Sequence, residues 1–137
     1  MILSDHFISL NTKLTAIFRI ISSKYDISFS QYCMIMKIHS SGTSMSHLAN
    51  NLGLDKSTLT RNINILIKRE IVEKFRDSND LRVYKVILSN KGEKLKVDLY
   101  SDLDSFSSKL LFSLDDDTQN KINVIDKLVQ KLDAQEI

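Results

Sequence analysis

The chain has 137 residues, a length that suits one domain, and its 42% hydrophobic and 26% charged residues indicate a globular protein. It has no proline, three glycines and no tryptophan, which disfavours a turn-rich β-sandwich and an aromatic platform for single-stranded nucleic acid. No apolar run approaches the ~18 residues of a membrane span, and residues 1–6 do not resemble a secretion signal. With Cys33 as the single cysteine, these features predict a cytoplasmic protein without membrane attachment.

The net charge of +2 hides an uneven distribution along the chain. Residues 41–96 carry 11 Lys and Arg against 6 Asp and Glu, whereas residues 97–137 carry 4 against 9. A basic segment of this kind can face phosphates while the acidic part faces away, so the middle of the chain is a candidate for nucleic-acid binding. Helical proteins with other partners can show the same split, so the charge alone does not decide the function.

Apolar residues at helical spacing predict two helices in the first third of the chain. Residues 5–24 carry one apolar stripe at steps of three and four. Its members are Phe7, Leu10, Leu14, Ile17 and Ile21. A second helix is expected over residues 29–40, with either Ser28 or Ser30 as its N-cap.

The next segment predicts two helices joined by a tight turn. Ser44 is the candidate N-cap of the first helix, and Gly53 suits the left-handed position after its end. Asp55 is the candidate N-cap of the second, expected over residues 56–69. The buried stripe of this second helix is formed by Leu59, Ile63, Leu66 and Ile67. Together the two helices form a helix-turn-helix pattern.

Residues 71–76 and 82–88 follow as two strands, separated by turn-forming residues at 77–80. The second strand alternates between two faces, as a half-buried strand does. A hairpin directly after a helix-turn-helix is a wing.

Two amphipathic helices end the chain. Ser89 to Gly92 begins a long helix, and Ser113 is the expected cap of a last helix whose first turn holds residues 115–117. These helices have no large core nearby to cover their apolar sides. A second copy of the chain is the natural cover, so we predict a homodimer; the alternative is that these helices pack within one chain.

The motifs of this segment resemble the winged helix of the MarR/SlyA transcriptional regulators. The resemblance lies in the run from Ser46 to Ile63, in residues 71–74, in residues 80–82 and in the Leu88 to Gly92 helix start. The helix order before and after also matches, so the resemblance covers essentially the whole chain. The expected fold class is therefore mainly α with a small β-hairpin wing.

The resemblance also implies an organisation and a function. Residues 29–92 would form the DNA-binding lobe, and residues 1–28 and 93–137 the helical dimerisation region of a single MarR-like domain, 1–137. A bacterial-type homodimer would bind double-stranded DNA at an inverted repeat, usually as a repressor released by a small-molecule effector or by oxidation. The alternative is a winged-helix protein–protein interaction module without sequence-specific DNA binding.

The face of residues 56–69 opposite the buried stripe is the candidate DNA-reading surface. Arg61 can bond guanine O6 and N7 with its fork, either Asn62 or Asn64 can read adenine, and Ile65 can touch a thymine methyl. Small hydroxyls near the start of the helix allow close entry into a major groove. From this helix the candidate DNA-binding residues are Lys56, Ser57, Thr58, Thr60, Arg61, Asn62, Asn64 and Lys68.

The wing contributes three further candidate DNA-binding residues: Arg76, Asp80 and Arg82. Arg82 is the candidate for insertion into the minor groove, where narrow A·T tracts attract arginine. Asp80 is expected to orient a neighbour, with either Arg61 or Arg82 as its partner. Glu70 stands where the resemblance leads us to expect glycine, and a positive φ there would cost about 1 kcal/mol.

Four residues are candidate walls of an effector pocket, which the resemblance places between the dimerisation region and the winged helix. They are Phe18, Tyr25, Tyr32 and Met36. Aromatic and methionine side chains at helical spacing are also ordinary core residues, so both interpretations stay open.

Cys33 is either a buried, inert thiol or a redox sensor. His6, His39 and His47 are scattered, so we expect no metal site. The sequence contains no glycine-rich phosphate loop and no Ser/His/Asp set, so we expect no cofactor and no enzyme activity.

Overall fold

The computed structural model describes residues 2–133 of the chain, and it divides into two compact units, Met1–Ser101 and Asp102–Ile137. Residue 1 and residues 134–137 of the predicted dimerisation region lie outside the described residues. Among residues 2–133, no helix is both long and apolar enough to cross a membrane.

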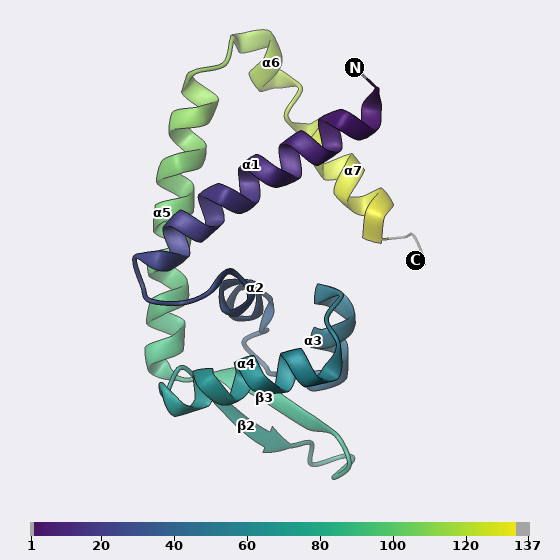
Figure 1. Ribbon diagram of the computed structural model, residues 1–137, viewed down its shortest axis with the longest axis vertical. Helices are drawn as coiled ribbons and strands as arrows, with labels where there is room; N and C mark the ends of the chain where they lie inside the picture. The colour runs from purple at the N-terminus through teal and green to yellow at the C-terminus, as the bar shows by residue number, and fades with distance from the viewer. Residues whose placement is uncertain (1, 134–137) are drawn as a thin grey trace. The chain divides into compact units, whose positions relative to one another are not determined.

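The chain is mainly helical with one small sheet, which confirms the predicted fold class (Figure 1). The first unit holds α1 (Leu3–Ser23), α2 (Phe29–Lys37), β1 (Thr43–Ser44), α3 (Met45–Leu52), α4 (Lys56–Lys68), β2 (Val72–Arg76), β3 (Tyr84–Leu88) and the start of α5 (Asn90–Phe112). The second unit holds the end of α5, α6 (Asp116–Asn120) and α7 (Asn123–Asp133).

Side-chain caps fix the starts of the three helices of the winged-helix lobe. Ser28 and Gln31 form a capping box at α2, in which each side chain accepts a hydrogen bond from the backbone of the other residue. Ser44 caps α3, and Asp55 caps α4. Gly53, with a φ of 63°, ends α3 in the left-handed conformation and turns the chain into α4.

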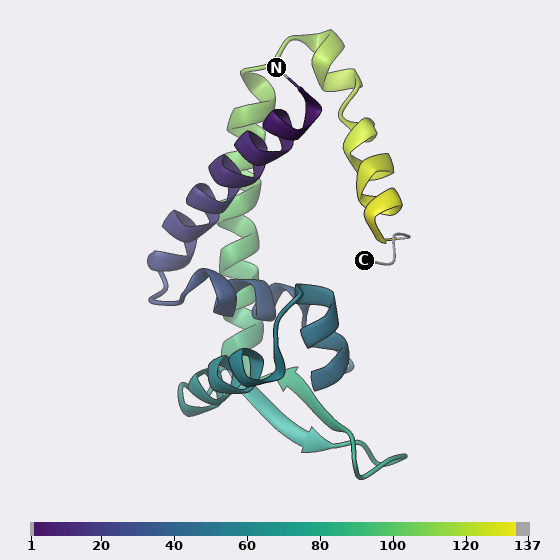
Figure 2. The same ribbon diagram turned by 45° about the vertical axis from the view of Figure 1, so that its right-hand side comes forward.

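The sheet has the strand order β1-β3-β2, and both pairs are antiparallel. In the hairpin Val72 pairs with Leu88 at the base, and Arg76 pairs with Tyr84 further out. Figures 1 and 2 show α4 lying across the base of this hairpin, while its tip projects beyond the helix as the wing. The two-residue strand β1 is absent from the predicted elements because so short a strand has no period to detect.

The core of the first unit consists of aliphatic side chains from α2, α3, α4, the sheet and α5, and from Ile38 and Ile71 beside these elements. Those almost fully buried are Met34, Ile35, Ile38, Leu48, Leu59, Ile63, Leu66, Ile71, Val72, Val86 and Leu99. Each such side chain contributes about 1.5–3 kcal/mol to the free energy of unfolding. This core fixes the position of α4 and of the base of the wing, and so of the surface that they present.

Three expectations at helix ends are corrected. The second helix ends at Lys37 and not at residue 40, because Ile38 is already extended and is buried in the core. The predicted last helix is two helices, α6 and α7. Its expected cap, Ser113, instead donates to the Leu110 carbonyl oxygen at 2.6 Å, and Asp115 caps α6.

Candidate nucleic-acid interface

Helix α4 buries one side and exposes the other, as its spacing predicts. Leu59, Ile63 and Leu66 are at most 1% exposed. The opposite side is exposed to solvent along its whole length, and its residues are Lys56, Ser57, Arg61, Asn64, Ile65 and Lys68. Three of these six side chains are cationic, so the free face of α4 is basic.

Two of the α4 residues predicted to bind DNA are used inside the protein. Thr58 donates its hydroxyl and its backbone N–H to the Asp55 carboxylate, which stabilises the start of the helix. Asn62 is half-buried, donates to the Thr58 carbonyl oxygen at 3.0 Å and accepts from Gln31 of α2 at 3.4 Å. Of the two asparagines considered for adenine, Asn64 is therefore the one whose amide lies on the free face.

The acidic cap of α4 is held in its charged form. Hydrogen bonds from the Thr58 side chain and backbone lower the pKa of Asp55. The Asp55 carboxylate oxygens thus accept hydrogen bonds from their own helix, while the neighbouring Lys56 and Ser57 remain exposed.

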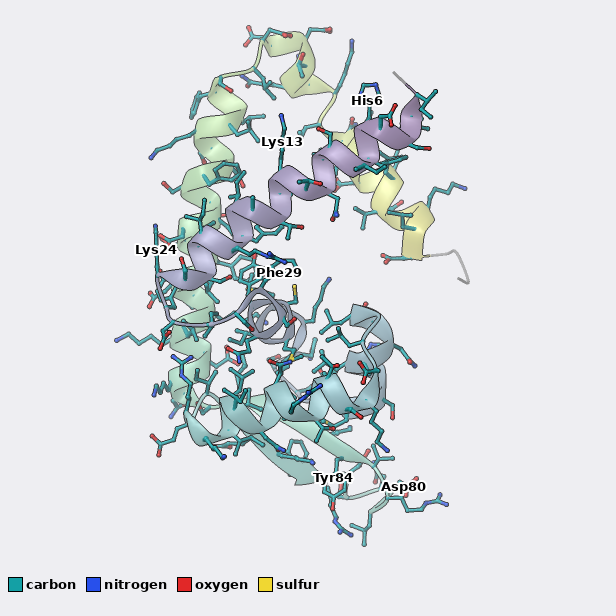
Figure 3. The ribbon with its side chains drawn as sticks, in the orientation of Figure 1. His6, Lys13, Lys24, Phe29, Asp80 and Tyr84 are labelled. Carbon is teal, nitrogen blue, oxygen red and sulfur yellow. The ribbon has the colours of Figure 1, made fainter. Side chains whose placement is uncertain are left out.

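At the wing tip Arg82 is paired with Asp80, which settles the choice of partner left open by the sequence (Figure 3 labels Asp80 on the wing). The Arg82 Nε atom lies 3.1 Å from Asp80 Oδ1, and the Arg82 backbone N–H donates to the same oxygen. This pairing lowers the pKa of Asp80. The Arg82 side chain is nonetheless 91% exposed, so Asp80 orients a guanidinium that stays free to reach a partner.

Tyr84 also lies on this surface, although the sequence did not predict it as a DNA-binding residue. Its ring lies 4.5 Å from Lys74 Nζ and 5.1 Å from the Arg76 guanidinium carbon, and its hydroxyl oxygen accepts from Arg76 Nη2 at 2.9 Å. The alternation of residues 82–88 places Tyr84 on the same face as two buried residues, which makes it look like a core residue. Only the length of the hairpin beyond the core shows that it is exposed.

A hollow of about 390 Å³ lies between α3, the first turns of α4 and the wing. Lys56, Thr60, Lys74, Arg82 and Tyr84 are among its lining residues, none of which is acidic. The basic face of α4 and the basic wing thus border one concave surface.

The candidate effector residues form part of an aromatic stack between α1 and α2. The Phe18 ring lies 5.6 Å from the Tyr32 ring and 6.4 Å from the Phe29 ring, centroid to centroid (Phe29 is labelled in Figure 3). Tyr25 instead donates its hydroxyl to the Asp98 carbonyl oxygen at 3.4 Å, and Met36 is half-buried. The structure brings Phe18 and Tyr32 together in this stack and places Tyr25 and Met36 outside it.

Cys33 is half-buried on α2. Burial raises the pKa of its thiol, although nearby Lys37 opposes this shift. Because the thiolate is the reactive form, this surrounding favours the inert thiol of the two interpretations.

Solved structures identify this architecture as the fold of MarR-type winged-helix regulators. Apo MarR from E. coli superposes with a TM-score of 0.79 at 21% identity, covering 96% of each chain. A MarR transcriptional regulator from Methanosarcina mazei Go1 has a TM-score of 0.76 at 26% identity, covering 94% of this chain and 97% of that one. A complex of S. aureus MepR with DNA gives a TM-score of 0.75 at 16% identity, covering 96% and 99%.

Sequence comparison gives the family within this class. Residues 16–99 match the family described as "Transcriptional regulator SarA/Rot". The HTH-type transcriptional regulator YhbI of Bacillus subtilis strain 168 is 36% identical over 84 residues, which cover 61% of this chain and about half, 54%, of that relative. The chain therefore belongs to the SarA/Rot family of transcriptional regulators, and the predicted likeness to MarR-type winged-helix regulators is confirmed.

Proposed function

We propose that this protein is a homodimer that binds double-stranded DNA at an inverted repeat and thereby represses transcription. The observation that carries this proposal is the exposed basic face of α4 next to the exposed Arg82 of the wing. A helix with an exposed polar face can enter a major groove, and an arginine on a neighbouring element can enter the minor groove beside it. The lobe offers both on adjoining elements.

Helix α4 supplies the base contacts in this proposal. Arg61 bonds the O6 and N7 atoms of guanine, which is worth about 1–3 kcal/mol of discrimination against other bases. Asn64 bonds an adenine edge, and Ile65, 45% exposed, contacts a thymine methyl. Lys56, Ser57 and Lys68 contact the flanking phosphates.

A second copy of the chain is proposed to cover the apolar side chains of the terminal helices. On α1, Leu3, Phe7 and Leu10 are each more than half exposed. On α7 the aliphatic side chains of Ile125, Leu128, Val129 and Leu132 are 46–64% exposed. Side chains of this kind are normally covered, and self-association covers them in a symmetric dimer that places two lobes on two half-sites about one helical turn apart.

Repression would follow from competition with the transcription machinery for the same DNA. Release of the DNA would follow when an effector favours a dimer whose two lobes no longer fit the half-sites. An effector that binds without altering the affinity for DNA would contradict this mechanism.

Salt dependence distinguishes this function from a protein–protein interaction module. Phosphate contacts release counterions, so the affinity for duplex DNA should fall steeply as the salt concentration rises. We expect that fall in equilibrium binding of the full chain to a labelled duplex. Binding that is absent at low salt would favour the interaction module.

A further inference from the structure

The inner face of the wing changes its character where the hairpin leaves the core. Directly opposed residues share one face of a sheet, and here Lys74 opposes Val86 while Arg76 opposes Tyr84. Val72 and Val86, at the base, are buried. Further out along the two strands, the same face carries Lys74, Arg76 and Tyr84, all exposed. An apolar face thus becomes a cationic and aromatic one at the edge of the hollow.

The Tyr84 hydroxyl accepts a hydrogen bond within the wing and keeps its own donor available. Its oxygen already accepts from Arg76 Nη2 at 2.9 Å, and its ring is flanked by Lys74 and Arg76. The hydroxyl proton has no acceptor among the residues that the structure describes. Arg76 therefore fixes the phenol and leaves its donor for a partner outside the chain.

The hollow beside Tyr84 has the chemistry of an anion site. Lys56, Lys74 and Arg82 supply three positive charges, and Thr60 and Asn50 add polar groups. The pairing of Arg82 with Asp80 leaves the other two charges uncompensated by any lining carboxylate. A phosphodiester offers both the negative charge and the oxygen acceptors that these groups require.

We propose that this hollow binds a phosphodiester of the DNA strand that crosses from the groove occupied by α4 to the groove occupied by the wing. Tyr84 donates its hydroxyl to a phosphate oxygen, and Lys74 neutralises the charge. Arg76 is a positioning residue that holds Tyr84. The position argues for a DNA strand as the occupant, because α4 and the wing form opposite walls and a strand passing between their grooves must cross the gap. This inference rests on the proposed function.

The test is equilibrium binding of the full chain to a labelled duplex of arbitrary sequence over a series of salt concentrations. Lys74→Gln should lower the slope of log affinity against log salt by about 0.9 for each protomer bound, and Lys74→Arg should restore it. Tyr84→Phe should weaken binding roughly fivefold to tenfold at every salt concentration, with the slope unchanged, because the lost donor is neutral. Lys13→Gln, an exposed change on α1, should alter neither quantity.

Two results would overturn the proposal while leaving DNA binding intact. In the first, Lys74→Gln keeps the wild-type slope of log affinity against log salt and only its thermal unfolding temperature falls. Lys74 and Tyr84 would then have a purely structural role. In the second, Lys74→Gln again keeps the wild-type slope. In addition, inorganic phosphate stabilises the wild type, but not Lys74→Gln, more than chloride does at equal ionic strength. That result would assign the hollow to a free anion. A wild-type chain that shows no salt-dependent binding would instead remove the proposed function itself.

Discussion

Glu70 occupies a left-handed backbone conformation, with a φ of 61°, in the turn between α4 and β2. The turn needs this conformation because the Glu70 N–H bonds the Ile67 carbonyl oxygen and the Ile71 N–H bonds the Leu66 carbonyl oxygen. A Cβ atom makes this conformation unfavourable by about 1 kcal/mol. The resemblance predicted glycine at position 70, and the positive φ of Glu70 confirms that this position favours glycine.

Replacement of this glutamate should stabilise the protein. We expect Glu70→Gly to raise the free energy of unfolding by about 1 kcal/mol in a urea titration. Gly53→Ala is the matched control with the opposite sign, because Gly53 has a φ of 63° and an added Cβ would meet nothing within 4 Å. The free energy of unfolding of Gly53→Ala should be lower by about 1 kcal/mol, from backbone strain alone. A destabilising Glu70→Gly would show that the glutamate side chain has a role of its own.

Tyr32 should make the stability of the protein fall at high pH. Burial raises the pKa of Tyr32 to about 12, from an ordinary value of 10.0. The folded state thus holds the phenol proton more tightly than the unfolded state. The resulting stability is complete below pH ~10 and is lost as the pH rises through the folded pKa.

We expect the wild-type free energy of unfolding to fall more steeply above pH ~10 than that of Tyr32→Phe, which keeps a ring in the stack but has no proton to lose. Identical pH profiles for wild type and Tyr32→Phe would contradict the assigned burial of the hydroxyl.

At the scale of elements, α5 is joined to the lobe through the segment Ser89 to Gly92. Ser89 Oγ donates to the carbonyl oxygens of Glu70 and Ile71 and accepts from the Gly92 N–H. Gly92 is buried here, and a Cβ added to it would lie 2.1 Å from the Ile71 carbonyl oxygen. Helix α5 therefore approaches the backbone of the turn between α4 and β2 so closely that only glycine fits at residue 92.

Gly92→Ala should destabilise the protein by roughly 3 kcal/mol or more, because the clash is with backbone and cannot be relieved by a side-chain rotation. Thermal unfolding measures this loss. Glu93→Ala, an exposed change in the same helical turn, should stay within about 0.5 kcal/mol of the wild type. Equal stability of the two variants would mean that α5 can shift away from Ile71.

Most caps and turns could be predicted from local chemistry, whereas contacts between packed elements could not. The caps at Ser44 and Asp55 and the turn at Gly53 follow from hydrogen bonds and backbone conformation within a few residues. Which of Asn62 and Asn64 faces outward depends on where α2 packs, and the sequence left that choice open. Local rules also failed at α6, where Asp115 and not Ser113 is the cap.

The candidate site divides in the same way. The periodicity of α4 identified the exposed Arg61 face, and the turn residues identified the wing tip with Asp80 and Arg82. Tyr84 could not be identified from its place in the alternating strand, because the alternation gives the face of a residue and not the point at which that face leaves the core.

For the whole molecule the proposed dimer makes a direct prediction. Leu128→Asp on α7 should convert a dimer to a monomer in sedimentation equilibrium, because it places a charge in the proposed apolar interface. Ile65→Asp on α4 is the matched control, since Ile65 is 45% and Leu128 46% exposed, and it should remain dimeric. A monomeric wild type, or a Leu128→Asp variant that stays dimeric, would remove α7 from the interface.

The central claim is that two lobes of a dimer recognise a DNA sequence through the free face of α4. Binding selection from random duplex DNA at physiological salt, with wild type and Arg61→Ala side by side, tests it most directly. We predict that the wild type enriches an inverted repeat with half-sites about one helical turn apart and that Arg61→Ala no longer does. Enrichment of the same repeat by both proteins would remove Arg61 from base recognition, and enrichment of no sequence by the wild type would contradict sequence-specific binding.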